Sequence, residues 1–378
     1  MKWLNCEKMR VFIAFMVVFV LCGRSTKADF TFGEPVHIGP PFSSSGGDGV
    51  DCISYDGLEM YHTSNRAGTY GGWDIWVSTR ETIDDEWGAP VNLGPTVNTS
   101  RPDACSNISA DGLELYFSSY NRSGGYGSWD AWVTRRSTKD EEWGVPMNLG
   151  LPVNSSAADE IAGISPDGLE LYVSSDRPGG YGSDDLWVSR RATKNDPWGE
   201  PTNLGPVVNS SACEGVAFLS SDGLMLFFSE DTGTGDPIRP GGYGNLDMWV
   251  TRRASLSDLW CTPVNLGPIV NTSSLDGAPR ISPDGSTLYF CSERPGGLGG
   301  NWGDAYQAPV LPIVDFNGDE IVDLDDLLVM IENWGTDNSL CDIGPMPWGD
   351  SVVDIEDLIV FMEYWEKENM PQETLDGE

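Results

Sequence analysis

Short stretches in which apolar and polar residues alternate recur along most of the chain, separated by glycine-containing turns. In one such copy, residues 161–165 and 169–175 flank an Asp-Gly turn, and residues 185–191 follow a glycine-rich loop at 178–182. Alternation with a period of two, bounded by Gly, Pro and Asp, is typical of β-strands. The extended, proline-containing segment WGEPTNLG at 198–205 then predicts a short outer edge strand.

The sequence pattern of this group of strands recurs five times along the chain. The aspartates of the five Asp-Gly turns lie 55 to 62 residues apart, at Asp56, Asp111, Asp167, Asp222 and Asp284. Repeats of this length, made of short strands, match the blades of a β-propeller, whereas helical repeats are shorter and show a 3.6-residue apolar spacing. The fifth copy lacks an outer strand, and a spare one, FGEPVHIG, precedes the first copy. We therefore expect an all-β five-bladed propeller over residues 29–308, with a strand at 32–39 closing the last blade.

Residues 1–28 have the layout of a signal peptide. Basic residues flank an apolar run at 11–22, and small residues follow near Ala28. The run is too short to cross a bilayer as a helix. We expect cleavage near Ala28, no membrane span, and a secreted protein that is extracellular or attached to the cell surface.

Charge narrows the range of partners. The chain carries 58 acidic and 22 basic residues, a net charge of −36. Nucleic acids are excluded as partners, because phosphate binding requires basic patches. The two histidines, His37 and His62, are too few for a histidine-rich metal site.

The acidity is concentrated beyond an apolar linker at 309–314. The segment DFNGDEIVDLDD has the spacing of an EF-hand-type calcium loop. Its expected ligands are Asp315, Asn317, Asp319, the carbonyl of Ile321, Asp323 and Asp326. The helix that follows, at 324–334, places Leu324, Leu327, Leu328 and Ile331 on one face.

A second, similar unit follows with a longer loop. Its expected ligands are Asp342, Asp350, the carbonyl of Val352, Asp354 and Asp357, ahead of a helix at 355–365. Met346 and Trp348 occupy the first and third positions and cannot ligate a hard cation, so Asp342 is their substitute. We expect one Ca²⁺ in the first loop and a weaker second site here, within a domain spanning 315–366 and ahead of an acidic tail at 367–378.

Two resemblances follow from these motifs. The duplicated loop with Asp at its twelfth position, followed by a helix and NWG, resembles a dockerin type I domain. The strand motif ISPDGLELYVSSDRPGG resembles the WD40-like repeat of TolB-type propellers. The first resemblance implies calcium-dependent docking to a cohesin-like or cell-surface protein.

An acidic residue stands eight positions before each Asp-Gly turn. These residues open the expected innermost strands and form a ring near one mouth of the channel: Asp48, Asp103, Asp159, Glu214 and Asp276. They could bind a cation or a basic ligand. Alternatively, they pair with the arginine of each repeat and fix neighbouring blades, which we favour because every repeat carries both partners: Arg66, Arg122, Arg177, Arg239 and Arg294.

Two functions remain open. The first is a non-catalytic binding or scaffold protein with a carbohydrate or protein ligand. The alternative is a glycoside hydrolase of extracellular polysaccharide degradation, with Glu214 as a weak candidate for the general acid. Glycosidases need two carboxyl groups in unlike environments, whereas these carboxylates recur in every repeat. We therefore assign no catalytic residue and favour binding.

Overall fold

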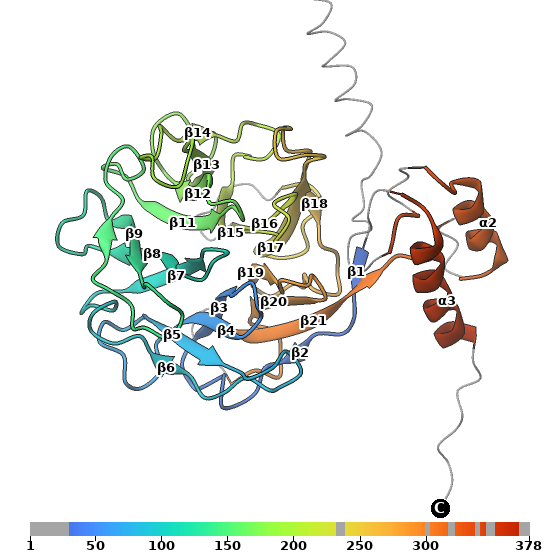
Figure 1. The fold of residues 1–378 in the computed structure, drawn as a ribbon, viewed down its shortest axis with the longest axis horizontal. Helices are drawn as coiled ribbons and strands as arrows, with labels where there is room; N and C mark the ends of the chain where they lie inside the picture. Colours follow the sequence, from blue (N-terminus) through green and yellow to red (C-terminus); the bar gives the residue numbers. More distant parts are fainter. Residues whose placement is uncertain are drawn as a thin grey trace, which may run out of the picture.

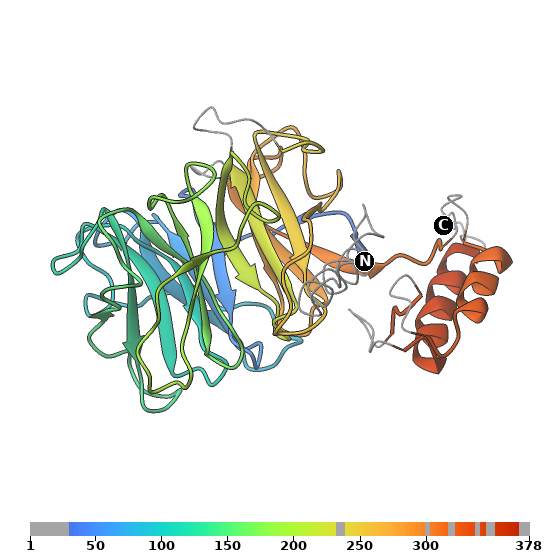
Figure 2. The same ribbon diagram turned by 90° about the horizontal axis from the view of Figure 1, so that it is seen from above.

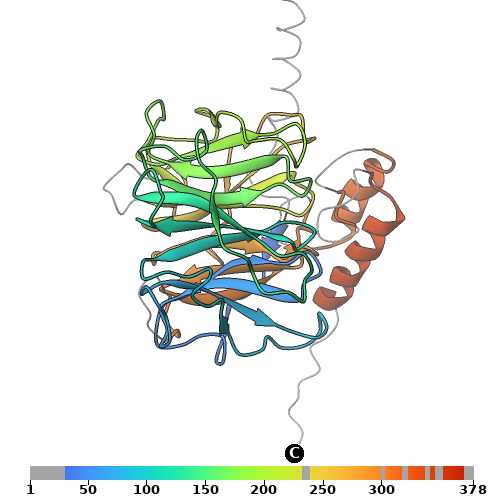
Figure 3. The same ribbon diagram turned by 60° about the vertical axis from the view of Figure 1, so that its left-hand side comes forward.

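The computed structural model describes residues 30–231, 239–298, 303–316, 322–336, 341–344 and 352–369. Within these ranges, five antiparallel sheets surround a common axis, and two helices lie beside them (Figure 1). The predicted all-β five-bladed propeller is therefore confirmed. Seen from the side, the sheets lie next to one another (Figure 3). No helix in these ranges is long and apolar enough to cross a membrane.

Each of the first four blades is built from four consecutive strands. The first and second contain β3(Asp48–Ile53), β4(Glu59–Ser64), β5(Asp74–Thr79), β6(Val91–Asn92), β7(Asp103–Ile108), β8(Glu114–Tyr120), β9(Trp129–Arg135) and β10(Met147–Asn148). The third and fourth contain β11(Asp159–Ile164), β12(Glu170–Ser175), β13(Asp185–Arg190), β14(Thr202–Asn203), β15(Cys213–Leu219), β16(Met225–Asp231), β17(Leu246–Arg252) and β18(Val264–Asn265). The strands β3, β7, β11 and β15, with β19 of the fifth blade, contact one another in order around the axis and are therefore innermost.

The hydrophobic core lies between neighbouring blades. Tyr116 of the second blade, for example, packs in one cluster with Ile161 and Trp187 of the third. Ion pairs also join the blades at the end of the channel where the inner strands finish. The Nη2 atom of Arg136 lies 2.6 Å from the Oε2 atom of Glu59, which belongs to the preceding blade. These contacts explain why the repeats need one another, because a single blade cannot bury both faces.

The fifth blade is closed by the N-terminal segment. It contains β19(Asp276–Ile281), β20(Thr287–Ser292) and β21(Asp304–Pro312), and β2(Val36–His37) pairs with β21 as the fourth strand. In addition, β1(Phe30–Phe32) pairs with the far end of β21 and buries its phenylalanines. Most of the segment expected as a linker, 309–314, is therefore strand, because this pairing extends β21 to Pro312.

The chain leaves β21 to form a small unit beside the propeller, with α2(Leu324–Glu332) and α3(Ile355–Asn369) (Figure 2). This unit has its own core, in which the rings of Phe316 and Phe361 stack with centroids 5.7 Å apart. Two short helices do not by themselves establish a dockerin domain.

The apolar face expected for the first of these helices is only partly buried. Leu327 packs on the core, and Met330 is fully buried, whereas Leu324, Leu328 and Ile331 are exposed. The inward face is set instead by Asp326, which is fully buried and accepts a backbone N–H bond. The spacing pattern identified the apolar stripe, of which only Leu327 packs on the core.

Candidate functional site at the channel mouth

The five acidic residues of the expected ring open the five inner strands, at the end of the channel that we call the acidic mouth. All five are buried, and each pairs with the arginine of its own repeat. In the third blade, Asp159 lies 2.5 Å from Arg177 and also accepts hydrogen bonds from the hydroxyl groups of Ser155 and Ser175. These carboxylates therefore hold the loops and strands of the repeat together, and they are not available to a ligand.

The fourth blade departs from this pattern. Glu230 stands opposite Glu214, where the other blades have a serine opposite an aspartate. Arg239 bonds both glutamates, at 3.0 Å from Glu214 and 2.6 Å from Glu230. Burial raises the pKa of Glu214, and the charge of Glu230 adds to the rise, against the lowering effect of Ser210 and Arg239. Glu214 has no exposed surface, so the weak candidate for the general acid cannot contact a substrate in this conformation.

A cavity of about 300 Å³ opens at the acidic mouth between the third, fourth and fifth blades. We call it the mouth cavity. Its polar lining includes Glu160, Asp184 and Asp231 together with the thiols of Cys213 and Cys291. It is also lined by Val216 and Ala278, which have a positive φ at bulges of their inner strands. Such backbone strain is concentrated at functional sites in proteins.

Burial in the cavity raises the pKa values of two of the carboxyl groups that line it. Burial raises the pKa of Glu160 to about 7, and the negative charge of Asp184 adds to the effect. Burial also raises the pKa of Asp184, although the Cys213 thiol, 3.3 Å from its Oδ2 atom, acts in the opposite direction. A carboxyl group that keeps its proton near neutral pH can donate a hydrogen bond or a proton to a ligand.

Glu160 and Asp184 were missed in the sequence, although the repeat contains a signal that could have found them. At the position of Glu160, the other blades have only small residues: Gly49, Ala104, Gly215 and Gly277. At the position of Asp184, they have Trp73, Trp129, Leu246 and Gly303. Glu160 and Asp184 thus break the repeat, whereas the carboxylates of the acidic ring follow it and stabilise the fold.

Further inside, the five inner strands carry residues of unequal size four positions before the aspartate of each Asp-Gly turn: Cys52, Asn107, Gly163, Phe218 and Arg280. Arg280 is almost completely buried and donates hydrogen bonds to the carbonyl oxygens of Asp51 and Val216, in the first and fourth blades. Its guanidinium group also lies 5.6 Å from the centroid of the Phe218 ring. The arginine therefore bridges three blades across the axis.

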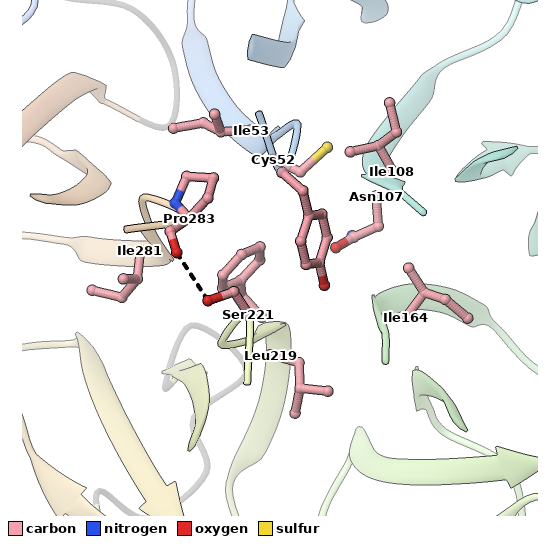
Figure 4. A pocket seen from close by; sticks show the side chains of 11 residues that line it. Cys52, Ile53, Asn107, Ile108, Ile164, Leu219, Ser221, Ile281 and Pro283 are labelled. Carbon is pink, nitrogen blue, oxygen red and sulfur yellow. Dashed lines mark hydrogen bonds between the residues drawn. The ribbon is translucent and has the colours of Figure 1, made fainter. Parts of the chain in front are cut away.

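The opposite mouth is shallow. Figure 4 shows one aliphatic side chain arriving from each blade, namely Ile53, Ile108, Ile164, Leu219 and Ile281. Its cavity measures about 20 Å³, room for roughly one water molecule. Ser221 closes one side by donating a 2.9 Å hydrogen bond to the carbonyl of Pro283. Of the two mouths, the acidic one has the room for a ligand and is lined by carboxyl groups.

The expected calcium ligands fall partly within the described residues. Asn317, Asp319, Ile321 and Asp350 lie outside them, as do the segment 1–28 and most of the acidic tail. Asp323 and Asp354 cap the two helices by accepting the backbone N–H groups of Asp325 and Glu356, each at 2.8 Å. Val352 is exposed, and its carbonyl was the expected ligand.

The two loops are built alike. Asp326 accepts backbone N–H bonds from Phe316 and Asp323 at 2.7 and 2.9 Å. Asp357 accepts the matching bonds from Ile343 and Asp354 at 2.5 and 2.6 Å. Asp342, directly before Ile343, therefore holds in the second loop the place that Asp315 holds in the first.

Both loops supply the hard oxygen donors that suit Ca²⁺, and the segment 315–378 contains a single basic residue, Lys367, that could compete for them. Within the described ranges, which omit 317–321 and 345–351, no group of three Asp, Glu, His or Cys side chains is placed to hold a metal ion. The residues fit a calcium ion in type and buried position, and its presence is a proposal.

No protein-family model matches the sequence, and no curated protein matches it. Several solved structures match this chain at low identity. TolB from Acinetobacter baumannii is 14% identical with a TM-score of 0.41, and the match covers 71% of this chain but 55% of that one. An α-L-arabinofuranosidase from Lactobacillus brevis is 13% identical with a TM-score of 0.43, covering 76% and 90%. A GH62 hydrolase in complex with xylotriose is 11% identical with a TM-score of 0.43, covering 77% and 99%. Likeness at this level concerns the fold and not the function.

Proposed function

We propose that this protein is a secreted, non-catalytic propeller that binds a carbohydrate or protein ligand at its acidic mouth and is docked to a partner by its C-terminal unit. The signal-peptide layout of residues 1–28 supports export. The full ion pairing of the repeated carboxylates supports binding over catalysis, because it leaves none of them free to move a proton.

One observation carries the docking proposal. Each helix of the C-terminal unit exposes an apolar stripe with the spacing i, i+4, i+7, formed by Leu324, Leu328 and Ile331 in α2 and by Ile355, Ile359 and Met362 in α3. Residues with this spacing share one face of a helix. Exposed apolar stripes of this kind mark sites of protein interaction. Because the two loops are built alike, either stripe could face a cohesin-like or cell-surface protein.

Calcium would make this docking conditional. Asp326 and Asp357 connect each loop to the start of the following helix, so an ion bound in the loop would fix the helix that presents the stripe. We propose one Ca²⁺ in the first loop and a second in the loop of Asp342. The protein would then dock in calcium and detach in chelator.

Binding of the full chain to immobilised cohesin domains, measured by surface plasmon resonance in calcium and in EDTA, tests this proposal. We expect calcium-dependent binding that survives Leu328→Glu or Ile359→Glu alone and is lost in the double variant. Glu363→Gln, an exposed change on α3, is the matched control. Binding in EDTA, or full binding by the double variant, would contradict the proposal.

A second candidate, glycoside hydrolysis, is favoured by Glu160. Its pKa of about 7 suits a general acid, and Asp184 is a second carboxyl group lining the same cavity. Reducing-sugar release from xylan, arabinan and β-glucan by the full chain, compared with Glu160→Gln, tests it. Turnover that Glu160→Gln abolishes would establish the enzyme, and no release by either protein would reject it.

A further inference from the structure

Four tyrosines occupy the same place in successive blades and project from the acidic mouth. They are Tyr70, Tyr126, Tyr181 and Tyr243, with exposed fractions of 52%, 52%, 51% and 50%, and Leu298 takes this place in the fifth blade. Each lies in the loop between the second and third strands of its blade. The second strand runs antiparallel to the inner strand, so this loop lies at the end where the inner strand begins. We call these five residues the rim residues.

The backbone under each tyrosine is fixed. The N–H group of Tyr181 donates a 2.7 Å hydrogen bond to Asp185, and Tyr126 bonds Asp130 in the same way at 2.9 Å. The following glycine packs against the next blade, where a Cβ atom on Gly182 would lie 1.8 Å from the carbonyl oxygen of Ala212. Each loop is therefore held beside the entry of the next inner strand, at the rim of the channel.

The four tyrosine side chains are about half exposed. Within the described residues, none of the four rings stacks on another aromatic ring, and none of the four hydroxyl groups makes a hydrogen bond. The position two residues later varies freely among the same loops, as Gly72, Ser128, Ser183 and Asn245. Retention of tyrosine in four copies, at an exposed position where the ring makes neither an aromatic stack nor a hydrogen bond, favours a role in contact with a ligand.

Two of the rim residues, Tyr181 and Tyr243, lie in loops that lead into residues lining the mouth cavity. Asp184, which lines the cavity, is three residues after Tyr181, and Leu246, which also lines it, is three residues after Tyr243. A ligand on these two rings therefore reaches the carboxyl groups of Glu160 and Asp184. Flat amphipathic rings on fixed backbones, beside a few polar groups, form a pre-organised binding surface.

We propose that the rim residues and the mouth cavity bind a neutral polysaccharide chain. The phenol rings offer apolar faces to the C–H faces of sugar rings, and the carboxyl groups of the cavity accept and donate hydrogen bonds to sugar hydroxyls. The net charge of −36 and the carboxylates at the mouth exclude anionic polymers. Equivalent rings on successive blades suit a ligand that is itself a repeat, because several weak contacts combine along one chain.

This inference rests on the proposed binding function and names its ligand. The test is affinity electrophoresis of the full chain in gels containing xyloglucan, glucomannan, arabinoxylan or mixed-linkage β-glucan, with alginate and chitosan as charged polymers. We expect retardation by at least one neutral polymer, unchanged in 0.5 M NaCl, and none by alginate. The double variant Tyr181→Ser/Tyr243→Ser should bind about tenfold more weakly, and replacing all four tyrosines should abolish binding.

The double variant Val145→Ser/Leu259→Ser is the matched control, because these exposed side chains lie in the loops after the third strands, β9 and β17, at the other end of the blades. It should bind like the unmodified chain, and an unchanged thermal transition should show that all variants fold.

Undiminished binding by the four-tyrosine variant would overturn the role of the rim and leave the binding function standing. Binding only to chitosan, lost in salt, would overturn the neutral ligand. No binding to any polymer would overturn the inference and the carbohydrate form of the proposed function, and docking through the C-terminal unit would be unaffected.

Discussion

Glu214 and Glu230 lie opposite each other on neighbouring strands, both buried and both bonded to the guanidinium group of Arg239. One arginine thus balances two carboxylates here, whereas each of the other blades has one arginine for one carboxylate at this place. Removing a partner from a buried ion pair leaves an uncompensated charge.

We therefore expect Arg239→Met to lower the free energy of unfolding by about 3–5 kcal/mol. Arg122→Met is the matched variant, because Arg122 faces a single carboxylate, Asp103, at the longer distance of 3.5 Å. Urea unfolding followed by tryptophan fluorescence measures both. Equal losses of unfolding free energy in the two variants would mean that Glu230 does not increase the stabilisation that Arg239 provides.

The raised pKa of Glu160 predicts a dependence of stability on pH. The folded chain keeps this proton up to a pKa of about 7, whereas the unfolded chain releases it near the ordinary glutamate pKa of 4.5. Ionisation of Glu160 therefore costs stability as the pH rises from 4.5 through 7. Because the side chain is partly exposed, we expect Glu160→Gln to be more stable by about 2 kcal/mol at pH 8 and equal at pH 4. Urea midpoints at both values measure this, with the exposed Glu200→Gln as a control for lost charge.

Calcium should stabilise the C-terminal unit. At a hundredfold excess of the ion over its Kd, stabilisation should reach about 2.7 kcal/mol. Calorimetry of the full chain should show a transition that moves down in EDTA, and Asp326→Asn should remove this shift. The neighbouring Asp325→Asn, exposed in the same helical turn, should keep it. A transition indifferent to chelator would refute the calcium site.

Closure of the ring by β1 and β2 can be tested at one residue. Phe32 is buried against the far end of β21, and its replacement by alanine should cost about 3–5 kcal/mol. Thr31, on the other face of the same strand, should tolerate alanine with a change below about 0.5 kcal/mol. Guanidinium denaturation compares the two, and a neutral Phe32→Ala would place the closure elsewhere.

Repetition made the propeller predictable. The turn at Asp167 and the arginine at Arg177 recur at fixed offsets, so an interpretation of one blade applied to all five. The outer strand missing from the last copy and present before the first also indicated which segments pair, because a free sheet edge is unfavourable. The end of β21 was not predictable, because its last residues are strand only through contact with Phe30 and Phe32.

The site was harder to predict for the opposite reason. Comparing repeats draws attention to residues such as Asp159 that recur, and recurrence here reflects structural ion pairs. Glu160, next to it, projects into a cavity formed by three blades, and no single repeat contains that information. The face that α2 buries was likewise decided by Asp326, a polar residue that a hydrophobic pattern assigns to solvent.

The strand β21 has a mechanical consequence. It joins the ring to the C-terminal unit, and it is flanked by β20 on one side and by β1 and β2 on the other, all antiparallel to it. Tension applied through the C-terminal unit pulls along this strand, so the hydrogen bonds on both edges are loaded together in shear instead of opening one after another. The strands β1 and β2, which complete the ring, therefore also resist a pulling force applied through the C-terminal unit.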